Sequence, residues 1–246
     1  MMLARPITKA AGSIRSRSSA APRVRAVRAM AKYTVYVKGD PKTSTLLDCP
    51  FCHRVLLTLE TKGIHYDLRH IDFADKPQWL VEKFDGKVPV LEEGDMQMND
   101  SDKIVEWLEE KMPTPAMKAE TPEAAAKFLP AFRGYLMAAP EEAEDKKAAW
   151  MGALDTLEAA LAKVPGPLFG GASLNAVDAA LAPKVYHAFT ALKHFRGFDL
   201  YALPGNAYPA IKKYRLALAE LPAWKKTDYG QEAIIKGWER HGAKVQ

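Results

Sequence analysis

Asp48-Cys49-Pro50-Phe51-Cys52-His53 is the stretch that decides how this chain of 246 residues folds. The segment before it, 33–37, is β-branched and aromatic and predicts a buried strand. After it, apolar residues recur at helical spacing until Gly63 ends the pattern. Pro50 favours the first turn of that helix, which places Cys49 at the helix N-cap. The sequence therefore predicts a strand, a loop and a helix that begins directly after a cysteine.

The residues that follow extend this pattern into a thioredoxin-like order. We expect a strand at 66–71, a short helix at 77–84, strands beginning at Lys87 and Met96, and a helix opened by Asp100-Ser101. The order β-α-β-α-β-β-α predicts a mixed sheet with helices on both faces. Beyond Pro113 and Pro115 the pattern is helical only. We therefore predict an α/β plus all-α fold, with a thioredoxin-like domain at 30–112, a linker at 113–122 and an all-helical domain at 123–246.

The basic character of the chain is confined to one segment. The formal charge is +5, which by itself would suggest a nucleic-acid partner. Seven of the 35 Lys and Arg residues lie in residues 1–29, however, and the first acidic residue is Asp40. The rest of the chain carries 28 basic and 30 acidic residues, so we expect no nucleic-acid partner. The composition also excludes a disordered or disulfide-scaffold protein, and no apolar run reaches the length of a membrane span.

Residues 1–29 have the composition of an organelle transit peptide. They are rich in Arg and Ser, contain no acidic residue and lack the apolar region of a secretory signal. Val-x-Ala occurs twice, at 24–26 and 27–29, and resembles the cleavage context of plastid transit peptides. We expect a chloroplast location, with the mitochondrion as second choice. The alternative is a basic arm that contacts nucleic acid or membrane.

Three chemistries compete for the two cysteines of the chain, Cys49 and Cys52. A structural zinc site takes four ligands, and no second cysteine pair exists to complete one. Cys-x-x-Cys-His also matches the attachment pattern of c-type haem, but the surroundings predict strand, loop and helix rather than a haem pocket. A cysteine at a helix N-cap lies beside unpaired N–H groups, which favour its thiolate. We therefore expect Cys49 to be a nucleophile, with no metal and no permanently bound cofactor. Cys52 is a candidate resolving thiol, a supporting donor or an inert residue.

Two further segments predict a cleft for a short anionic peptide. In thioredoxin-like folds the proline before the third strand is cis, and here it is Pro89, which would expose the backbone of Val88 for pairing. Asp100 and Ser101 open a helix whose free N–H groups suit a carboxylate. The plainer interpretation of these features is a strand-start proline and an N-cap. Together with Cys49, they favour glutathione as co-substrate.

Several longer motifs resemble the plant dehydroascorbate reductases of the glutathione transferase superfamily. They are Asp48-Cys-Pro-Phe, Arg54-Val-Leu-Leu-Thr-Leu-Glu60, Asp75-Lys-Pro-Gln-Trp79, Gly86-Lys-Val-Pro-Val90, Asp100-Ser-Asp102 and Leu181-Ala-Pro-Lys-Val-Tyr-His187. The resemblance implies that two glutathione molecules reduce dehydroascorbate to ascorbate, with Cys49 as nucleophile and Asp48 in support. It implies glutathione contacts from Lys38, Asp48, Lys76, Val88, Pro89, Asp100 and Ser101, and ascorbate contacts from Lys38, Asp48, His187 and Trp238.

The chain departs from that family at one position of the motif. The family usually has Ser where this chain has Cys52, so this chain has the second thiol that an internal disulfide requires. One alternative function is a glutaredoxin-like or omega-type thiol transferase, which shares the Cys49 chemistry but removes glutathione from proteins. Another is a membrane-associating protein similar to chloride intracellular channels, but the apolar segment 55–59 is short and lies between Arg54 and Glu60. We expect a monomer without stable membrane insertion.

Overall fold

The computed structural model describes residues 32–245. The predicted transit peptide, residues 1–29, therefore lies outside the described residues. None of the helices within 32–245 has the length and apolar character needed to cross a membrane.

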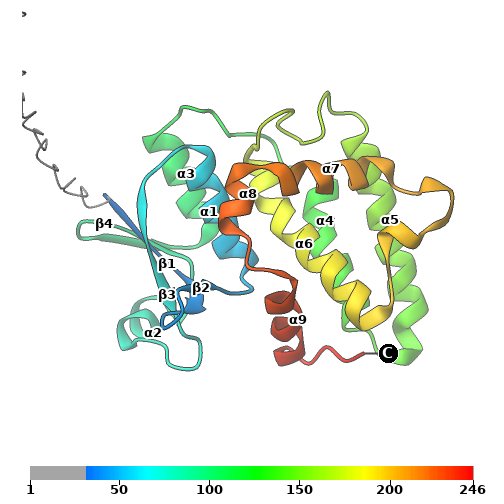
Figure 1. Ribbon diagram of the computed structural model, residues 1–246, viewed down its shortest axis with the longest axis horizontal. Helices are drawn as coiled ribbons and strands as arrows, with labels where there is room; N and C mark the ends of the chain where they lie inside the picture. Colours follow the sequence, from blue (N-terminus) through cyan, green and yellow to red (C-terminus); the bar gives the residue numbers. More distant parts are fainter. Residues whose placement is uncertain (1–31, 246) are drawn as a thin grey trace, which may run out of the picture. The chain divides into compact units, whose positions relative to one another are not determined.

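The first part of the described chain is a mixed sheet with helices on both faces (Figure 1). Its elements are β1 (Tyr33–Asp40), β2 (Thr45–Leu46), α1 (Pro50–Thr61), β3 (Tyr66–Ile71), α2 (Gln78–Phe84), β4 (Val90–Glu93), β5 (Met96–Asn99) and α3 (Ser101–Lys111). β1 pairs in parallel with β3 and antiparallel with β4, and β5 pairs antiparallel with β4. The predicted thioredoxin-like order is confirmed, with the short strand β2 as an addition.

The strand predicted to begin at Lys87 begins at Val90 instead. Pro89 has no N–H to donate to a neighbouring strand, so the ladder starts after it. The peptide bond between Val88 and Pro89 is cis, as the sequence predicted. Val88 and Pro89 therefore form the approach to β4 rather than part of it.

The second part of the described chain is helical. Its elements are α4 (Glu123–Leu136), α5 (Ala143–Leu161), α6 (Ala176–Arg196), α7 (Pro209–Glu220), α8 (Pro222–Thr227) and α9 (Gln231–Arg240), with 3₁₀ turns η1 (Pro140–Glu142), η2 (Leu200–Ala202) and η3 (Pro204–Asn206). The sequence patterns did not predict α9. This helix packs against α6 and carries residues that reach the first part of the chain.

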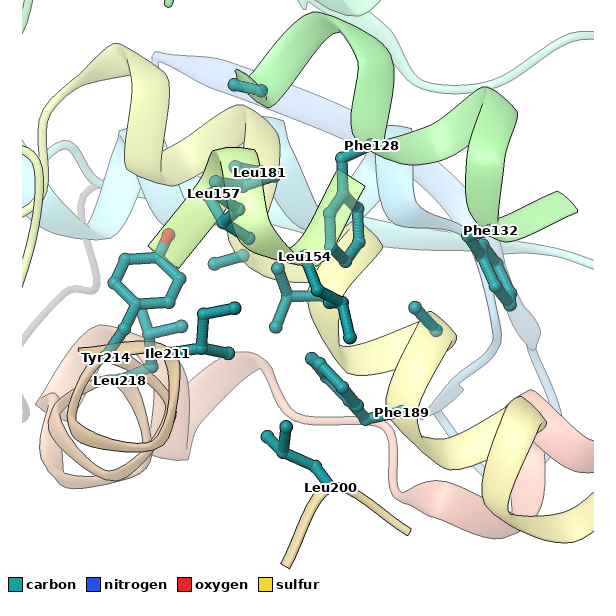
Figure 2. Close-up of a cluster of buried hydrophobic side chains, with 14 of the residues drawn as sticks. Phe128, Phe132, Leu154, Leu157, Leu181, Phe189, Leu200, Ile211, Tyr214 and Leu218 are labelled. Carbon is teal, nitrogen blue, oxygen red and sulfur yellow. The ribbon is translucent and has the colours of Figure 1, made fainter. Parts of the chain in front are cut away.

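The core of the helical part forms around α6. Asn175 and Asp178 begin this helix with the expected capping box, in which each side chain accepts the other residue's backbone N–H. Figure 2 shows Ile211, Tyr214 and Leu218 of α7 directed toward the leucines of α5. Burial of such side chains contributes about 1.5–3 kcal/mol each.

Helix α1 joins the two hydrophobic cores. Val55, Leu56 and Leu59 pack in the core under the sheet, whereas Leu57 packs in the helical core. α1 contacts both α6 and α8, which lie beside it in Figure 1. The N-terminus of α1 is therefore held between the sheet and the helical part.

Candidate active site

Cys49 occupies the N-cap of α1, with extended backbone (φ −127°, ψ 104°). Its Sγ accepts the backbone N–H of Cys52 at 3.4 Å. The thiol of Cys52, the backbone N–H groups of Cys52 and Phe51, and the positive charge of Lys38 lower the pKa of Cys49 despite its burial. Hydrogen-bond donors at the start of the helix thus favour the thiolate of Cys49, as the sequence predicted.

Cys52 lies one turn further into α1 and has the opposite character. Its side chain is 2% exposed, and burial followed by the proximity of Cys49 raises its pKa well above the ordinary value. Both cysteines are free thiols. Cys52 is therefore a neutral donor to the Cys49 sulfur in this structure.

Asp48 is a buried carboxylate held by two cations. Its Oδ1 lies 2.9 Å from Lys38 Nζ and 2.8 Å from Arg240 Nη2. A carboxylate beside a thiolate would oppose ionisation, and the two cations offset that effect. Gly237 of α9 packs so closely that a Cβ atom added there would overlap the Asp48 carboxylate. Gly237 and Arg240 therefore position a group that lies almost two hundred residues earlier in the chain.

A hydrogen-bonded chain in the helical part fixes the tautomer of His187. The indole N–H of Trp238 donates to His187 Nδ1 at 3.1 Å, so Nδ1 is unprotonated. The proton of the neutral ring is then on Nε2, which donates to the Tyr229 hydroxyl at 2.9 Å. Burial, and then the charge of Lys38, lowers the pKa of His187 to about 3. His187 is therefore neutral near pH 7, and the hydroxyl proton of Tyr229 is not used in this contact.

A hollow of about 240 Å³ opens next to these groups. Its lining residues are Asp48, Pro50, Phe51, Leu129, Arg133, His187, Trp238 and His241. Three of the four predicted ascorbate contacts, Asp48, His187 and Trp238, thus lie around one space. Lys38 is not part of this lining and contacts Asp48 instead.

The predicted glutathione contacts lie on the sheet side of the site. Lys38 and Lys76 both approach the ring of Phe73, with Nζ 5.2 Å and 4.2 Å from its centroid. Val88 packs against the same hydrophobic cluster as Cys49 and Cys52.

The start of α3 forms a small polar cluster with Arg54 of α1. Asp100 caps α3 by accepting the N–H of Asp102, and the adjacent Ser101 is buried. Arg54 of α1 donates to the Ser101 hydroxyl at 3.4 Å and pairs with Asp102 at 2.5 Å.

Comparison with known proteins identifies the family of the chain. "Glutathione S-transferase, N-terminal domain" matches residues 44–116, and "Glutathione S-transferase, C-terminal domain" matches residues 140–217. A crystal structure of Chlamydomonas reinhardtii dehydroascorbate reductase is 50% identical, with a TM-score of 0.80, over 85% of this chain and 98% of that one. The chain belongs to the dehydroascorbate reductase family of the glutathione transferase superfamily. The expectations for family and fold are thereby confirmed.

Relatives in this reductase family carry names with different compartments. "Probable glutathione S-transferase DHAR1, cytosolic" of Oryza sativa subsp. japonica is 38% identical over 81% of this chain and 92% of its own length. "Glutathione S-transferase DHAR3, chloroplastic" of Arabidopsis thaliana is 33% identical over 83% of this chain and 78% of its own length.

The sequence patterns did not identify four residues of the candidate active site. They are Arg54, Tyr229, Gly237 and Arg240, and each acts through a contact between segments distant in sequence. Tyr229 and Arg240 are ordinary in their local sequence, so no local signal marked them. The Gly-Trp pair at 237–238 was the one available hint, and it pointed to Trp238 alone. Within residues 32–245, no group of three or more His, Cys, Asp and Glu side chains could hold a metal ion.

Proposed function

We propose that this chain reduces dehydroascorbate to ascorbate with glutathione as electron donor, and that Cys49 is its nucleophile. The activity is the one that names its family. The observation that carries the assignment of the site is the N-cap position of Cys49. There its pKa is lowered, beside a hollow lined by Asp48, His187 and Trp238.

In the first half-reaction the sulfur of Cys49 gives two electrons to dehydroascorbate. A water molecule supplies the oxygen that remains on sulfur, so Cys49 becomes a sulfenic acid. The hydrogens of the thiol and of water balance the reduced product, ascorbic acid, which leaves as ascorbate after loss of a proton. This step requires sulfur, because an alcohol at the same position cannot be oxidised in this way.

In the second half-reaction two glutathione molecules restore the enzyme. The first thiol condenses with the sulfenic acid, forming a mixed disulfide and releasing water. The second attacks the glutathione sulfur of that disulfide, so glutathione disulfide forms and the Cys49 thiolate leaves. The lowered pKa of Cys49 makes it a good leaving group in this exchange.

The neutral and charged groups around the hollow take different parts in this proposal. The Asp48 carboxylate and the His187 ring are suited to contact the hydroxyls of dehydroascorbate. Lys38 offsets the negative charge of Asp48 and of the Cys49 thiolate. Tyr229 holds the Nε2 side of His187, and its own hydroxyl proton is available for an anion formed near Cys49.

Glutathione would bind along the sheet side of the site. The backbone of Val88 before the cis proline is suited to pair with the extended peptide, and Lys38 and Lys76 are suited to its carboxylates. The start of α3, at Asp100 and Ser101, offers backbone N–H groups to a second carboxylate. Glutathione enters as a co-substrate and leaves oxidised.

The purified chain should form ascorbate from dehydroascorbate in a glutathione-dependent reaction, followed by the ultraviolet absorbance of ascorbate. A glutathionylated peptide assayed in parallel tests the thiol-transferase alternative. Faster turnover of the peptide than of dehydroascorbate would favour that alternative. Absence of glutathione-dependent ascorbate formation would reject the proposed function.

We also propose that the protein acts in the chloroplast. The support is the composition of residues 1–29, together with the chloroplastic designation of one relative. Mass spectrometry of the protein's N-terminus in isolated organelles tests this. A plastid form that begins near residue 30 is expected, and recovery of the intact N-terminus from the cytosol would contradict it.

A further inference from the structure

The lining of the hollow beside Cys49 includes an arginine, Arg133, to which the proposed reaction gives no part. This arginine lies on α4, one turn after Leu129, which lines the same hollow. The neighbouring Phe132 packs edge-on against Trp238, with 5.2 Å between the ring centroids. Because this aromatic contact joins α4 to a residue of the lining, Arg133 is held at the wall of the hollow.

The guanidinium of Arg133 is unpaired. Across residues 32–245 it makes no ion pair and no hydrogen bond, whereas Lys127, on the same helix, pairs with Glu123 at 2.5 Å. The side chain of Arg133 is exposed, so water screens part of its charge. A guanidinium can donate two parallel hydrogen bonds to neighbouring oxygen atoms of an anion. Arg133 is therefore free to bind an anionic ligand of the hollow.

The other charges at the hollow already balance one another. In the described part of the chain, Asp48 is the one carboxylate of the lining, and its Oδ1 is paired with both Lys38 and Arg240. The thiolate of Cys49 brings a second negative charge, so two anions face two cations. The positive charge of Arg133 is therefore in excess, and it favours a ligand that carries a negative charge.

Charge distinguishes the two forms of the substrate. Dehydroascorbate is neutral near pH 7, whereas ascorbate is an anion because its enediol loses a proton. We propose, on the basis of the proposed function, that Arg133 is a specificity-determining residue that binds the enediolate oxygens of ascorbate. The hollow of the reduced enzyme then holds ascorbate more tightly than dehydroascorbate. Accumulated ascorbate excludes dehydroascorbate from the hollow, so the rate falls as the product increases.

Binding to the reduced full chain without glutathione tests the role of Arg133 apart from turnover. Ascorbate is compared with L-gulono-1,4-lactone, a neutral lactone of the same carbon skeleton, through amide chemical shifts around Trp238 and His241. We expect ascorbate to bind about fivefold more tightly than the lactone, and Arg133→Gln to remove this preference. Lys127→Gln is the matched control, since Lys127 is an exposed cation of α4 that does not line the hollow. Equal binding of the two compounds by the wild type, or an unchanged preference in Arg133→Gln, would overturn the proposal.

A conservative variant and a kinetic measurement separate charge from structure. Arg133→Lys keeps the positive charge and should keep most of the preference, so a loss equal to that of Arg133→Gln would contradict the charge argument. In turnover, followed by formation of glutathione disulfide, ascorbate should inhibit competitively against dehydroascorbate. Arg133→Gln should raise the inhibition constant about fivefold with little change in KM for dehydroascorbate. Normal turnover without a preference for ascorbate would reject the role of Arg133 alone, whereas absence of turnover would reject the proposed function.

Discussion

The two sides of the candidate active site differ in the charge of the residues that form them. At the N-terminus of α1 the groups carry charge: the Asp48 carboxylate and the Lys38 ammonium pair next to Cys49, whose pKa is lowered. On the helical side, His187 and Trp238 are neutral and are joined by a directional hydrogen bond. We propose that Lys38 and the start of α1 set the reactivity of the sulfur, whereas His187 and Trp238, together with Asp48, set the fit of the oxidised substrate.

Replacement of the nucleophile should have the largest effect. Cys49→Ser removes the atom that is oxidised, so we expect a loss of about 1,000-fold or more in glutathione-dependent ascorbate formation. Cys52→Ser retains a hydroxyl donor at the buried position and should keep much of the activity. If the Cys52 variant were the inactive one, the assignment of Cys49 would be wrong.

Gly237→Ala tests the contact between α9 and the α1 side. The added methyl group overlaps the Asp48 carboxylate, so Asp48 or α9 must move, and we expect kcat/KM for dehydroascorbate to fall by about 100-fold. Gly152→Ala in α5 is the control, because nothing lies within 4 Å of its added Cβ. It should leave activity unchanged and stabilise the protein by about 1 kcal/mol in denaturant unfolding. Unchanged activity of Gly237→Ala would show that the position of Asp48 is not critical.

Lys38→Met should alter the pH dependence of the rate. Lys38 lowers the pKa of Cys49, so its loss raises that pKa and reduces the thiolate fraction at neutral pH. A change of one pKa unit corresponds to a rate about tenfold lower below the pKa, with recovery at alkaline pH. Lys76→Met should instead raise KM for glutathione and leave the pH profile in place. The pH profile of kcat/KM distinguishes the two, and an identical profile for Lys38→Met and wild type would contradict the charge argument.

Trp238→Phe should have a smaller effect, confined to the oxidised substrate. It keeps the aromatic packing and removes the donor to His187 Nδ1, which is worth about 1 kcal/mol, or about fivefold in KM for dehydroascorbate. Tyr229→Phe removes the partner on the other side of the ring and should act in the same direction. KM for glutathione should not change in either variant. A fall in kcat/KM for glutathione in either variant would contradict the proposal that the helical side acts on the oxidised substrate.

The smallest expected effect concerns stability rather than rate. His53 packs against Trp224 and Tyr229, and burial lowers its pKa to about 3 from 6.5. Between these values the unfolded chain binds a proton that the folded chain does not, so stability decreases as pH falls below 6.5.

His53→Phe should reduce the pH dependence of the free energy of unfolding by up to about 1.4 kcal/mol per pH unit. Denaturant unfolding between about pH 4 and 6 measures this slope. Thr227→Val removes the hydrogen bond to His53 but keeps the imidazole, so its slope should match the wild type. An unchanged slope in His53→Phe would mean that His53 is protonated in the folded state.

The parts of the fold that depend on neighbouring residues were predictable from the sequence. Pro50 fixes the start of α1 and hence the N-cap position of Cys49, and Asn175 with Asp178 fixes the start of α6. Each of these signals involves residues within one helical turn. The cis peptide before Pro89 also followed from the predicted order of strands.

The contacts between α9 and the start of α1, which complete the candidate site, were not predictable from local sequence patterns. The ion pair between Asp48 and Arg240 joins residues 192 positions apart, and neither residue carries a local sign of the other. The sequence did not predict α9 as a helix, although the resemblance to dehydroascorbate reductases implied an ascorbate contact from Trp238 within it. The close approach at Gly237 is likewise visible only once α9 is packed against the start of α1.

The position of α9 has a consequence for how the enzyme is made. Asp48 and Cys49 leave the ribosome early, whereas Gly237, Trp238 and Arg240 emerge only after nearly two hundred further residues have been translated. Until then the Asp48 carboxylate lacks its guanidinium partner and His187 lacks its indole donor. A nascent chain therefore contains the N-cap cysteine long before the last residues that line the neighbouring hollow have been added.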